Sequence, residues 1–379
     1  MRQQEYSGFN SIRKLGPILS KHKPKSIFLV TGKSSYEKSG SKSILVELLK
    51  EYNITHFDDF ETNPKFNDVK KGLEIFKENN CDFIIAIGGG SVMDIAKLIN
   101  IFAANTGEQI RYIKKERNIE NKGKILVAIP TTSGSGSEAT HFAVVYVNKT
   151  KYSLAHEFVL PDYAIIDQQL TMSLPQHITA STGMDALGQA IESYWCINST
   201  DESKEYARQA IKIIMKNLAS SVNNPTEETR EAMAIAAHLT GKAINISKTT
   251  ASHAISYPIT SYFNVPHGHA VALTLAKMLV YNSQVTEEDV LDKRGVAYVK
   301  ETVNEIAKLM GAETIEEASK KIINLMKEIG LKVKLGELGI KTDEDVELII
   351  KNGFNPDRVK NNPKKLAEDN LRKILKEIR

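Results

Sequence analysis

Two segments in the first half of the chain each run from an apolar stretch into a loop of glycines and small hydroxyl residues. The first is CDFIIAIGGGSVMDIAK at 81–97, and the second is KILVAIPTTSGSGSEAT at 124–140. A buried strand that leads through a glycine-rich turn into an amphipathic helix is typical of an α/β domain. Apolar runs at 26–31, 82–87, 124–129 and 163–167 alternate with helical patterns, which predicts a doubly wound parallel sheet.

The two loops have the composition of a phosphate-binding site. Glycines let backbone N–H groups approach a pyrophosphate, and the N-terminus of the following helix, capped by Ser91, favours an anion. The first loop lacks the G-x-G-x-x-G spacing of the usual dinucleotide fingerprint, and many α/β turns are rich in glycine for steric reasons alone. Two such loops after two strands together favour a bound nucleotide.

The second half of the chain has a different pattern. Beyond Ser173, the sequence shows helical periodicity and no further strand-like runs through to residue 379. We therefore predict two domains, an α/β nucleotide-binding domain at 1–177 and an all-helical domain at 178–379. A chain of this length, with 41% hydrophobic and 25% charged residues, can bury two such cores.

Three residues of the second half have the chemistry of a metal site. Asp185 lies in GMDALGQAIESY, and His253 and His267 follow fourteen residues apart. Two imidazoles and a carboxylate suit zinc or ferrous iron, and three protein ligands leave a coordination position open for substrate. Each histidine alone would more often be a core residue. Pro258 and Pro266 interrupt the intervening segment, so we expect the two histidines on separate elements.

Four blocks resemble, in order, the signature blocks of the iron-containing (group III) alcohol dehydrogenase family: GGGSVMDIAK, PTTSGSGSEAT, GMDALGQAIESY and NVPHGHAVAL. The resemblance spans nearly the whole chain. It implies a dehydroquinate synthase-like architecture and hydride transfer between NAD(P) and a small alcohol or aldehyde. It also implies four metal ligands, at Asp185, Gln189, His253 and His267. Gln189 stands where the family has a histidine, and its amide oxygen is a weaker ligand, which leaves Fe²⁺ and Zn²⁺ both open.

The substrate prediction depends on the segment before His253. Gln189, INISKTTASHAISYPIT and VTGKSSYEKSG together resemble the phosphonoacetaldehyde reductase branch, which reduces phosphonoacetaldehyde to 2-hydroxyethylphosphonate. Lys248, with the hydroxyls of Thr249 and Thr250, could bind the phosphonate while the metal holds the aldehyde oxygen. The alternative for Lys248 is a solvated loop lysine. Gln189 could instead hydrogen-bond the substrate.

His269 is a candidate proton relay, because it lies two residues beyond His267 and could pass a proton to the alkoxide that hydride transfer generates. The alternative is a second histidine near the site with no catalytic role.

The end of the first predicted strand bears on the choice of cofactor. An acidic residue there would bind the ribose hydroxyls of NAD, but this chain has Gly32, with Lys33, Ser34 and Lys38 nearby. NADPH is therefore expected, with NADH possible. The resemblance also places Lys151 near the cofactor. The expected dinucleotide contacts are Gly32, Lys33, Ser34, Asn63, Gly89, Gly90, Ser91, Asp94, Thr131, Thr132, Ser135 and Lys151.

Two other enzyme classes stay open. One is a general short-chain alcohol dehydrogenase acting on neutral aldehydes such as lactaldehyde or butanal, for which Lys248 would be incidental. The other is a non-redox lyase like dehydroquinate synthase, which holds NAD and a three-ligand zinc on the same scaffold. The second and fourth blocks favour the alcohol dehydrogenase reading.

Global features predict where such an enzyme works. The net charge of +4 comes from lysines spread along the chain, which gives nucleic-acid binding little support. No apolar run reaches membrane-spanning length, and the N-terminal residues have no signal-peptide core. Cys81 and Cys196 have neither metal nor disulfide spacing. We expect a cytoplasmic enzyme that forms a homo-oligomer, with a dimer as the default.

Overall fold

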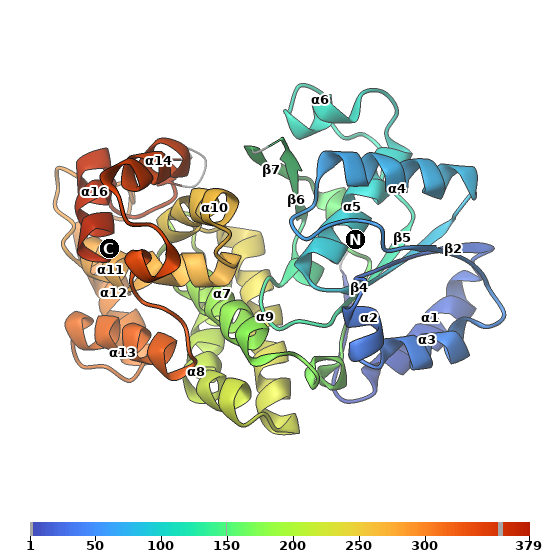
Figure 1. Cartoon of the computed structure of the whole chain (residues 1–379), viewed down its shortest axis with the longest axis horizontal. Helices are drawn as coiled ribbons and strands as arrows, with labels where there is room; N and C mark the ends of the chain where they lie inside the picture. The colour runs from blue at the N-terminus through green and yellow to red at the C-terminus, as the bar shows by residue number, and fades with distance from the viewer. Residues whose placement is uncertain (1–2, 149, 355–358) are drawn as a thin grey trace. The chain divides into compact units, whose positions relative to one another are not determined.

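The computed structural model describes residues 3–148, 150–354 and 359–379 (Figure 1). The chain divides into two compact units, Met1–Leu174 and Pro175–Arg379. This division falls three residues before the boundary predicted at 177. Pro175 precedes the first helix of the second unit, as expected for a residue that favours a helix start.

The first unit is built on a parallel sheet. Its strand order among the described residues is β1-β8-β5-β4-β2-β3, and β6 and β7 form a separate antiparallel pair. The strands are β1 (Gln4–Ser7), β2 (Ser26–Thr31), β3 (Asn53–Phe57), β4 (Phe83–Gly88), β5 (Ile125–Pro130), β6 (Phe142–Val147), β7 (Thr150–Ala155) and β8 (Tyr163–Ile166). The α-helices are α1 (Leu15–His22), α2 (Ser35–Lys38), α3 (Ser41–Leu49), α4 (Phe66–Glu78), α5 (Gly90–Ala104) and α6 (Gln109–Ile113).

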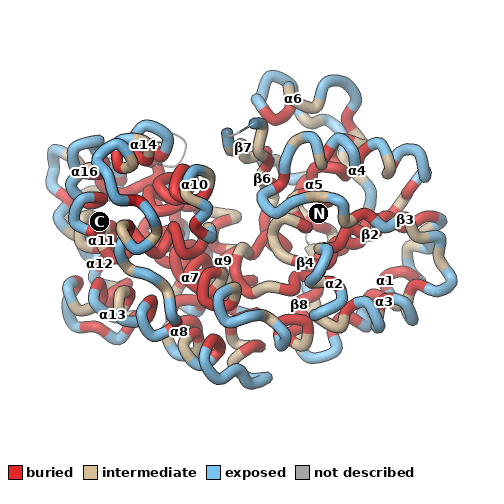
Figure 2. Tube along the Cα trace, in the orientation of Figure 1, coloured by how far each residue is buried: buried red, intermediate tan, exposed pale blue. Residues whose placement is uncertain are grey.

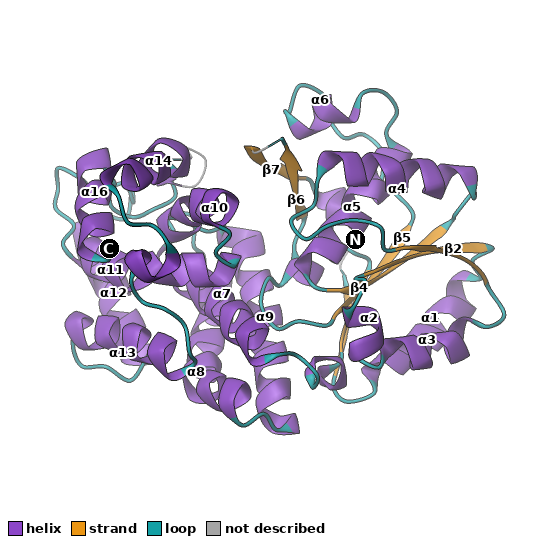
Figure 3. Cartoon of the chain, in the orientation of Figure 1, coloured by secondary structure: helices purple, strands orange, loops and turns teal. Residues whose placement is uncertain are grey.

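The apolar runs form strands because both faces of this sheet are covered. Every residue of β2 and β4 is buried. Phe28 and Val30 pack with residues of α4 and α5, whereas Ile27 and Leu29 pack with residues of α1 and α3. Figure 3 shows these helix pairs on opposite sides of the sheet. A parallel sheet buried on both faces therefore reads as continuous apolar sequence, as predicted.

The strand order of the sheet contains a switch point, which in open α/β sheets is the usual position of a ligand site. The chain passes from β2 to β3 on one side and then returns to form β4 on the other, so the direction of connection reverses between β2 and β4. Ligands of open α/β sheets bind beyond the carboxyl ends of the strands at such a switch point. Most of the predicted nucleotide contacts directly follow β2, β4 or β5, and so lie at the carboxyl ends of these strands.

The second unit contains helices joined by loops and no strand among its described residues, apart from one isolated bridge between Val290 and Lys364. This confirms the predicted all-helical half. Its helices are α7 (Gln176–Trp195), α8 (Asp201–Asn223), α9 (Glu227–Ser247), α10 (Ala251–Phe263), α11 (His267–Ser283), α12 (Val296–Leu309), α13 (Ile315–Glu328), α14 (Asp343–Gly353) and α16 (Glu368–Glu377). No helix in the described ranges is long and apolar enough to cross a membrane.

Helix α7 is the centre of this unit. Figure 2 shows it buried along most of its length, and α8, α9 and α11 pack against it. A helix enclosed in this way can carry polar side chains only where they find partners. Asp185, Gln189 and Glu192 are buried polar residues of α7, so their contacts define the candidate site.

Candidate active site

Three helices bring the predicted metal ligands together. Asp185 comes from α7, His253 from α10 and His267 from the first turn of α11, and their ligand atoms all lie within 4.8 Å of one another. His253 Nε2 lies 3.4 Å from Asp185 Oδ1, and His267 Nε2 lies 3.9 Å from the same oxygen. Asp185 and His253 are buried, whereas the His267 side chain is 30% exposed. His267 is therefore the most exposed member of the trio.

Two glycines allow these helices to approach closely enough. A Cβ on Gly268, next to His267, would overlap the Ser181 carbonyl oxygen and lie 2.7 Å from Asp185 Cβ. A Cβ on Gly188 would lie 2.6 Å from Val271 Cγ1. The absence of side chains at these positions lets the start of α11 pack directly on α7. This contact between α11 and α7 also brings His267 close to Asp185.

The two histidines lie on separate helices, as predicted. Helix α10 ends at Phe263, Asn264 adopts a left-handed conformation with φ 56°, and Pro266 precedes α11. Pro258 does not interrupt the segment, contrary to our expectation, because it lies inside α10. The helix tolerates the loss of one backbone donor there, and the chain breaks instead at the left-handed Asn264.

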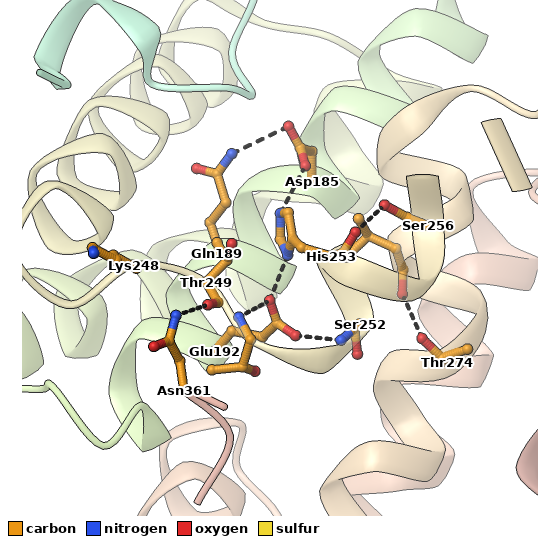
Figure 4. Close-up of polar contacts among 12 residues, drawn as sticks. Asp185, Gln189, Glu192, Lys248, Thr249, Ser252, His253, Ser256, Thr274 and Asn361 are labelled. Carbon is orange, nitrogen blue, oxygen red and sulfur yellow. Dashed lines mark hydrogen bonds and ion pairs between the residues drawn. The ribbon is translucent and has the colours of Figure 1, made fainter. Parts of the chain in front are cut away.

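Glu192 is a site residue that the sequence analysis missed. Its Oε2 lies 2.5 Å from His253 Nδ1 and accepts from the Thr250 N–H at 3.0 Å, and its Oε1 accepts from the Ser252 N–H at 2.6 Å (Figure 4). Burial alone would raise the pKa of Glu192, but the charge and hydrogen bond of His253 and the contacts from Thr250 lower it overall. An ionised carboxylate on Nδ1 leaves Nε2 of His253 directed at Asp185.

The residues present fit a divalent cation. His253 Nε2 is buried and forms no hydrogen bond of ordinary geometry with any residue that the structure describes. Burial opposes protonation of His253, but Glu192 and Asp185 outweigh it and raise its pKa to about 9. The site thus favours positive charge between this nitrogen and Asp185. The carboxylate–histidine pairing is also the usual support of a metal-bound imidazole.

Gln189 lies beside the trio with its amide nitrogen, not its oxygen, toward Asp185. Nε2 donates to Asp185 Oδ2 at 3.2 Å, and Oε1 accepts from the Thr240 hydroxyl at 3.0 Å. His269 turns toward another part of the unit, where its Nε2 lies 2.7 Å from the Lys332 carbonyl oxygen. Burial lowers the pKa of His269. The proton relay predicted for it gains no support from these contacts.

The predicted substrate residues form the link between α9 and α10. Lys248 is exposed, and Figure 4 shows it set apart from Asp185 and His253. Thr249 and Thr250 are buried. The Thr250 hydroxyl accepts from Trp195 Nε1 at 3.0 Å, and the Thr249 carbonyl accepts from Asn361 Nδ2 at 3.2 Å. These contacts give both threonines a role in holding the link in place.

In the first unit, the two predicted phosphate loops pack on each other. A Cβ on Gly90 would lie 2.8 Å from Ser135 Oγ, and one on Gly89 would lie 3.4 Å from the side chain of Thr132. The Asn63 N–H donates to Ser91 Oγ at 3.1 Å. The predicted contacts that follow β4 and β5 therefore lie together at the carboxyl ends of these two strands.

Two hydroxyls of the second loop fit a ligand. Thr131 Oγ1 and Ser133 Oγ are buried and have no hydrogen-bond partner among the described residues. Buried polar atoms are nearly always satisfied, so such a pair beside a glycine-rich helix start is consistent with a bound phosphate or ribose.

Asp94 and Lys97 hold this second loop from within. Asp94 accepts from Ser137 Oγ at 2.8 Å and from the Val144 N–H at 3.1 Å. The buried Lys97 ammonium donates to the carbonyl oxygens of Ser137, Thr140 and Phe142. Burial lowers the pKa of Lys97 to about 8. Lys97 was not among the predicted residues. The contacts of Asp94 indicate that Asp94 positions the loop.

The remaining cofactor predictions lie at the ends of β2 and β7. Gly32 follows β2, and the exposed Lys33 and Ser34 come next. Lys33 Nζ lies 3.4 Å from Asp59 Oδ1, and Lys71 pairs with the same carboxylate. Lys151, on β7, is close enough for its charge to oppose the raised pKa that burial gives Asp94.

Comparisons with known proteins extend over the whole chain. Residues 3–168 match the iron-containing alcohol dehydrogenase profile, and residues 179–379 match the C-terminal profile of the same family. An NAD-dependent methanol dehydrogenase of Bacillus methanolicus is 30% identical over 97% of this chain and 96% of its own. An NADPH-dependent butanol dehydrogenase of Clostridium saccharobutylicum is 33% identical over 98% and 95%.

A solved structure has the same fold across both units. The sulfoacetaldehyde reductase of Bifidobacterium kashiwanohense, crystallised in complex with NAD⁺, is 30% identical with a TM-score of 0.89, covering 99% of this chain and 96% of that one. The family matches and these relatives show an NAD(P)-dependent oxidoreductase of alcohols and aldehydes for which a divalent metal is expected. The chain thus belongs to the iron-containing alcohol dehydrogenase family.

Proposed function

We propose that the protein reduces phosphonoacetaldehyde to 2-hydroxyethylphosphonate, with NADPH as the hydride donor. The observation that carries the substrate is Lys248, an exposed cation at the link that leads into the helix of His253. A phosphonate bound there would lie on the same segment as a metal ligand. A lysine contact to the phosphonate would help to orient the substrate for hydride transfer.

The backbone of Lys248 supports a functional role. Its φ of 74° and ψ of 175° fall in a region that is almost reserved for glycine, and its N–H donates to the Ile244 carbonyl at 2.9 Å. A lysine in this conformation costs about 1–3 kcal/mol and persists where surrounding structure holds it. Such strain is concentrated at functional sites. Glycine would be the unstrained residue here, so a lysine at this position supports a role for its side chain.

The sulfoacetaldehyde reductase gives independent support. That relative is named for an aldehyde that carries a sulfonate, and a phosphonate is likewise a tetrahedral oxyanion that a lysine can bind. The overall similarity of 30% identity and TM-score 0.89 extends over both units. An anionic two-carbon aldehyde is therefore within the range of this fold.

The reducing step requires a positive partner for the aldehyde oxygen, because hydride addition leaves negative charge there. A metal held by Asp185, His253 and His267 would supply that Lewis acidity when bound. Glu192 keeps the His253 ring in its ligating orientation. Because His267 is the most exposed ligand of the trio, substrate would reach the metal beside it.

Charge at the end of β2 supports NADPH. Gly32 offers no carboxylate to the adenosine ribose, and Lys33 and Lys71 both pair with Asp59. Two lysines and one aspartate leave a net positive group, which suits a 2′-phosphate. The test is the ratio of kcat/KM for NADPH to that for NADH. A ratio below one would assign NADH instead.

Substrate specificity is tested with metal-reconstituted protein and three aldehydes, phosphonoacetaldehyde, sulfoacetaldehyde and propanal. We expect the highest kcat/KM for phosphonoacetaldehyde. Higher values for sulfoacetaldehyde would keep the anion site but change the substrate. Higher values for propanal would assign a general short-chain alcohol dehydrogenase, as the names of the methanol and butanol relatives suggest.

Lys248→Ala should lower kcat/KM for phosphonoacetaldehyde by about 10- to 100-fold, because it removes a charged hydrogen-bond donor. The value for propanal should change by less than about threefold, as for a surface substitution. Lys248→Arg is the matched control that keeps the charge. Equal losses with both aldehydes in Lys248→Ala would rule out the anion-binding role.

A further inference from the structure

We propose that Gln189 is not a metal ligand and that it acts, together with Thr240, as a positioning pair that fixes the Asp185 carboxylate. The two residues form a chain of hydrogen bonds from α9 to α7, which runs from the Thr240 hydroxyl through the Gln189 amide to Asp185 Oδ2. This inference concerns the metal site alone and is independent of the substrate proposed above.

The direction of the amide follows from its partners. Asp185 Oδ2 is an acceptor, so it selects the amide nitrogen, which lies 3.2 Å away. The amide oxygen then faces the fully buried Thr240 hydroxyl at 3.0 Å, and this hydroxyl shares its one proton between Gln189 and the Ala237 carbonyl oxygen at 2.8 Å. The Asp185 contact, which only a donor can satisfy, therefore sets the direction of the amide. Reversing the amide would place a carbonyl oxygen against a carboxylate oxygen, which is repulsive. Because an amide nitrogen has no lone pair to offer a cation, Gln189 supplies no ligand in this orientation.

The same hydrogen bond gives the two Asp185 oxygens different partners. Oδ2 is the oxygen bound by Gln189, whereas Oδ1 is the oxygen that faces His253 Nε2 at 3.4 Å and His267 Nε2 at 3.9 Å. The carboxylate is thereby presented through one oxygen. Figure 4 shows this arrangement, with the Gln189 amide on one side of Asp185 and the His253 ring on the other.

This geometry predicts how the site responds to substitution. Partners that orient a ligand typically contribute about 10- to 100-fold to metal affinity. If Gln189 acts through Asp185 and Thr240 acts through Gln189, removing either should weaken metal binding by a similar factor. Removing both should cost little more than removing one, because the two belong to one chain of contacts.

The experiment is a titration of metal-free protein with Co²⁺ against a chromophoric chelator, which gives a dissociation constant without any assay of turnover. The variants are Thr240→Val, Gln189→Leu and the double variant, with Thr240→Ser as the matched control that keeps the hydroxyl. We expect about 10- to 100-fold weaker binding for the first three and affinity near that of the parent protein for Thr240→Ser. Thermal melting of the metal-free variants verifies that each is folded.

The visible spectrum of the Co²⁺ protein provides the second readout. We expect the band positions of Gln189→Leu to match those of the parent protein, since the ligand set is unchanged. Gln189→His should shift the bands, because it adds an imidazole. A shift in Gln189→Leu, or parent-like affinity in Thr240→Val, would overturn the proposal. Gln189→Leu keeps the test valid if Thr240→Val does not fold.

Discussion

Glu192 shows how a single buried residue supports the candidate site without touching substrate. It accepts two backbone N–H groups at the start of α10 and also contacts the His253 ring. One carboxylate therefore fixes both the beginning of the helix and the orientation of its metal ligand. Its charge is compatible with full burial only because these donors surround it.

Glu192→Gln tests this role. We expect the metal dissociation constant to rise by about 10- to 100-fold, since the amide keeps the volume but loses the negative charge behind the imidazole. The measurement is chelator competition on the metal-free protein. Glu305→Gln is a suitable control, because Glu305 belongs to the same unit and its partners are the Tyr194 hydroxyl and Lys204. An unchanged constant in Glu192→Gln would remove Glu192 from the site.

Part of the site could be predicted from residues alone. Asp185, His253 and His267 are ligand types whose sequence pattern, with two intervening prolines, suggested separate elements. Glu192 escaped because a carboxylate in a helix is usually on the surface, and its burial depends on contacts from α10. A signal was available, since Glu192 lies seven residues after Asp185 and therefore on the same face of α7. Lys97 escaped for the same reason, because lysines are seldom buried.

At the level of elements, the central strands were predictable and the edge strands were not. Strands β2, β4, β5 and β8 begin and end within one residue of the apolar runs. Strands β1 and β3 lie at the two edges of the sheet and include exposed residues, so QEYS and NITHF carry no apolar run. The β6–β7 pair was also missed, although FAVVYV is an apolar run of the kind that predicts a strand; its partner TKYSLA is not. Whether an edge segment forms a strand depends on the adjacent strand with which it pairs, and a local sequence pattern does not identify that strand.

The contact between α7 and α11 gives a prediction at this scale. Gly268→Ala should lower the free energy of unfolding by about 1–3 kcal/mol, because the new methyl group would overlap the Ser181 backbone. Metal affinity should also fall, since relief of the overlap separates His267 from Asp185. Urea unfolding and Co²⁺ titration measure the two effects. In Gly16→Ala, where the nearest atom would lie 3.9 Å away, stability should be unchanged or slightly higher; a similar result for Gly268→Ala would contradict the packing argument.

At the level of the whole molecule, the candidate metal ligands all belong to the second unit, whereas the predicted phosphate loops belong to the first. The order of an α/β half followed by a helical half was predictable, because the strand-like runs stop before the helical periodicity begins. The residue at which one unit ends and the next begins was less predictable, because it depends on the contacts that Leu174 and Pro175 make with their own units.

Trp195 allows the effect of metal on the second unit to be measured. It is the single tryptophan of the chain and is buried at the end of α7, so its fluorescence reports unfolding of the second unit. Removing metal with a chelator should lower the midpoint of the tryptophan transition. Restoring it at about 100 times its dissociation constant should stabilise that unit by about 3 kcal/mol. If the midpoint of the tryptophan transition is the same with and without metal, the metal does not bind in the second unit.

The pairing of β1 with β8 bears on how the chain reaches this fold during synthesis. Gln4 lies opposite Tyr163 and Ser7 opposite Ile166, so the strand made first pairs with the strand made last in its unit. Contacts between such distant parts of a chain slow folding, because a long loop must close before they form. On the ribosome, β1 must wait until residue 166 has emerged from the exit tunnel. The first strand to be translated is therefore expected to be among the last to join the sheet.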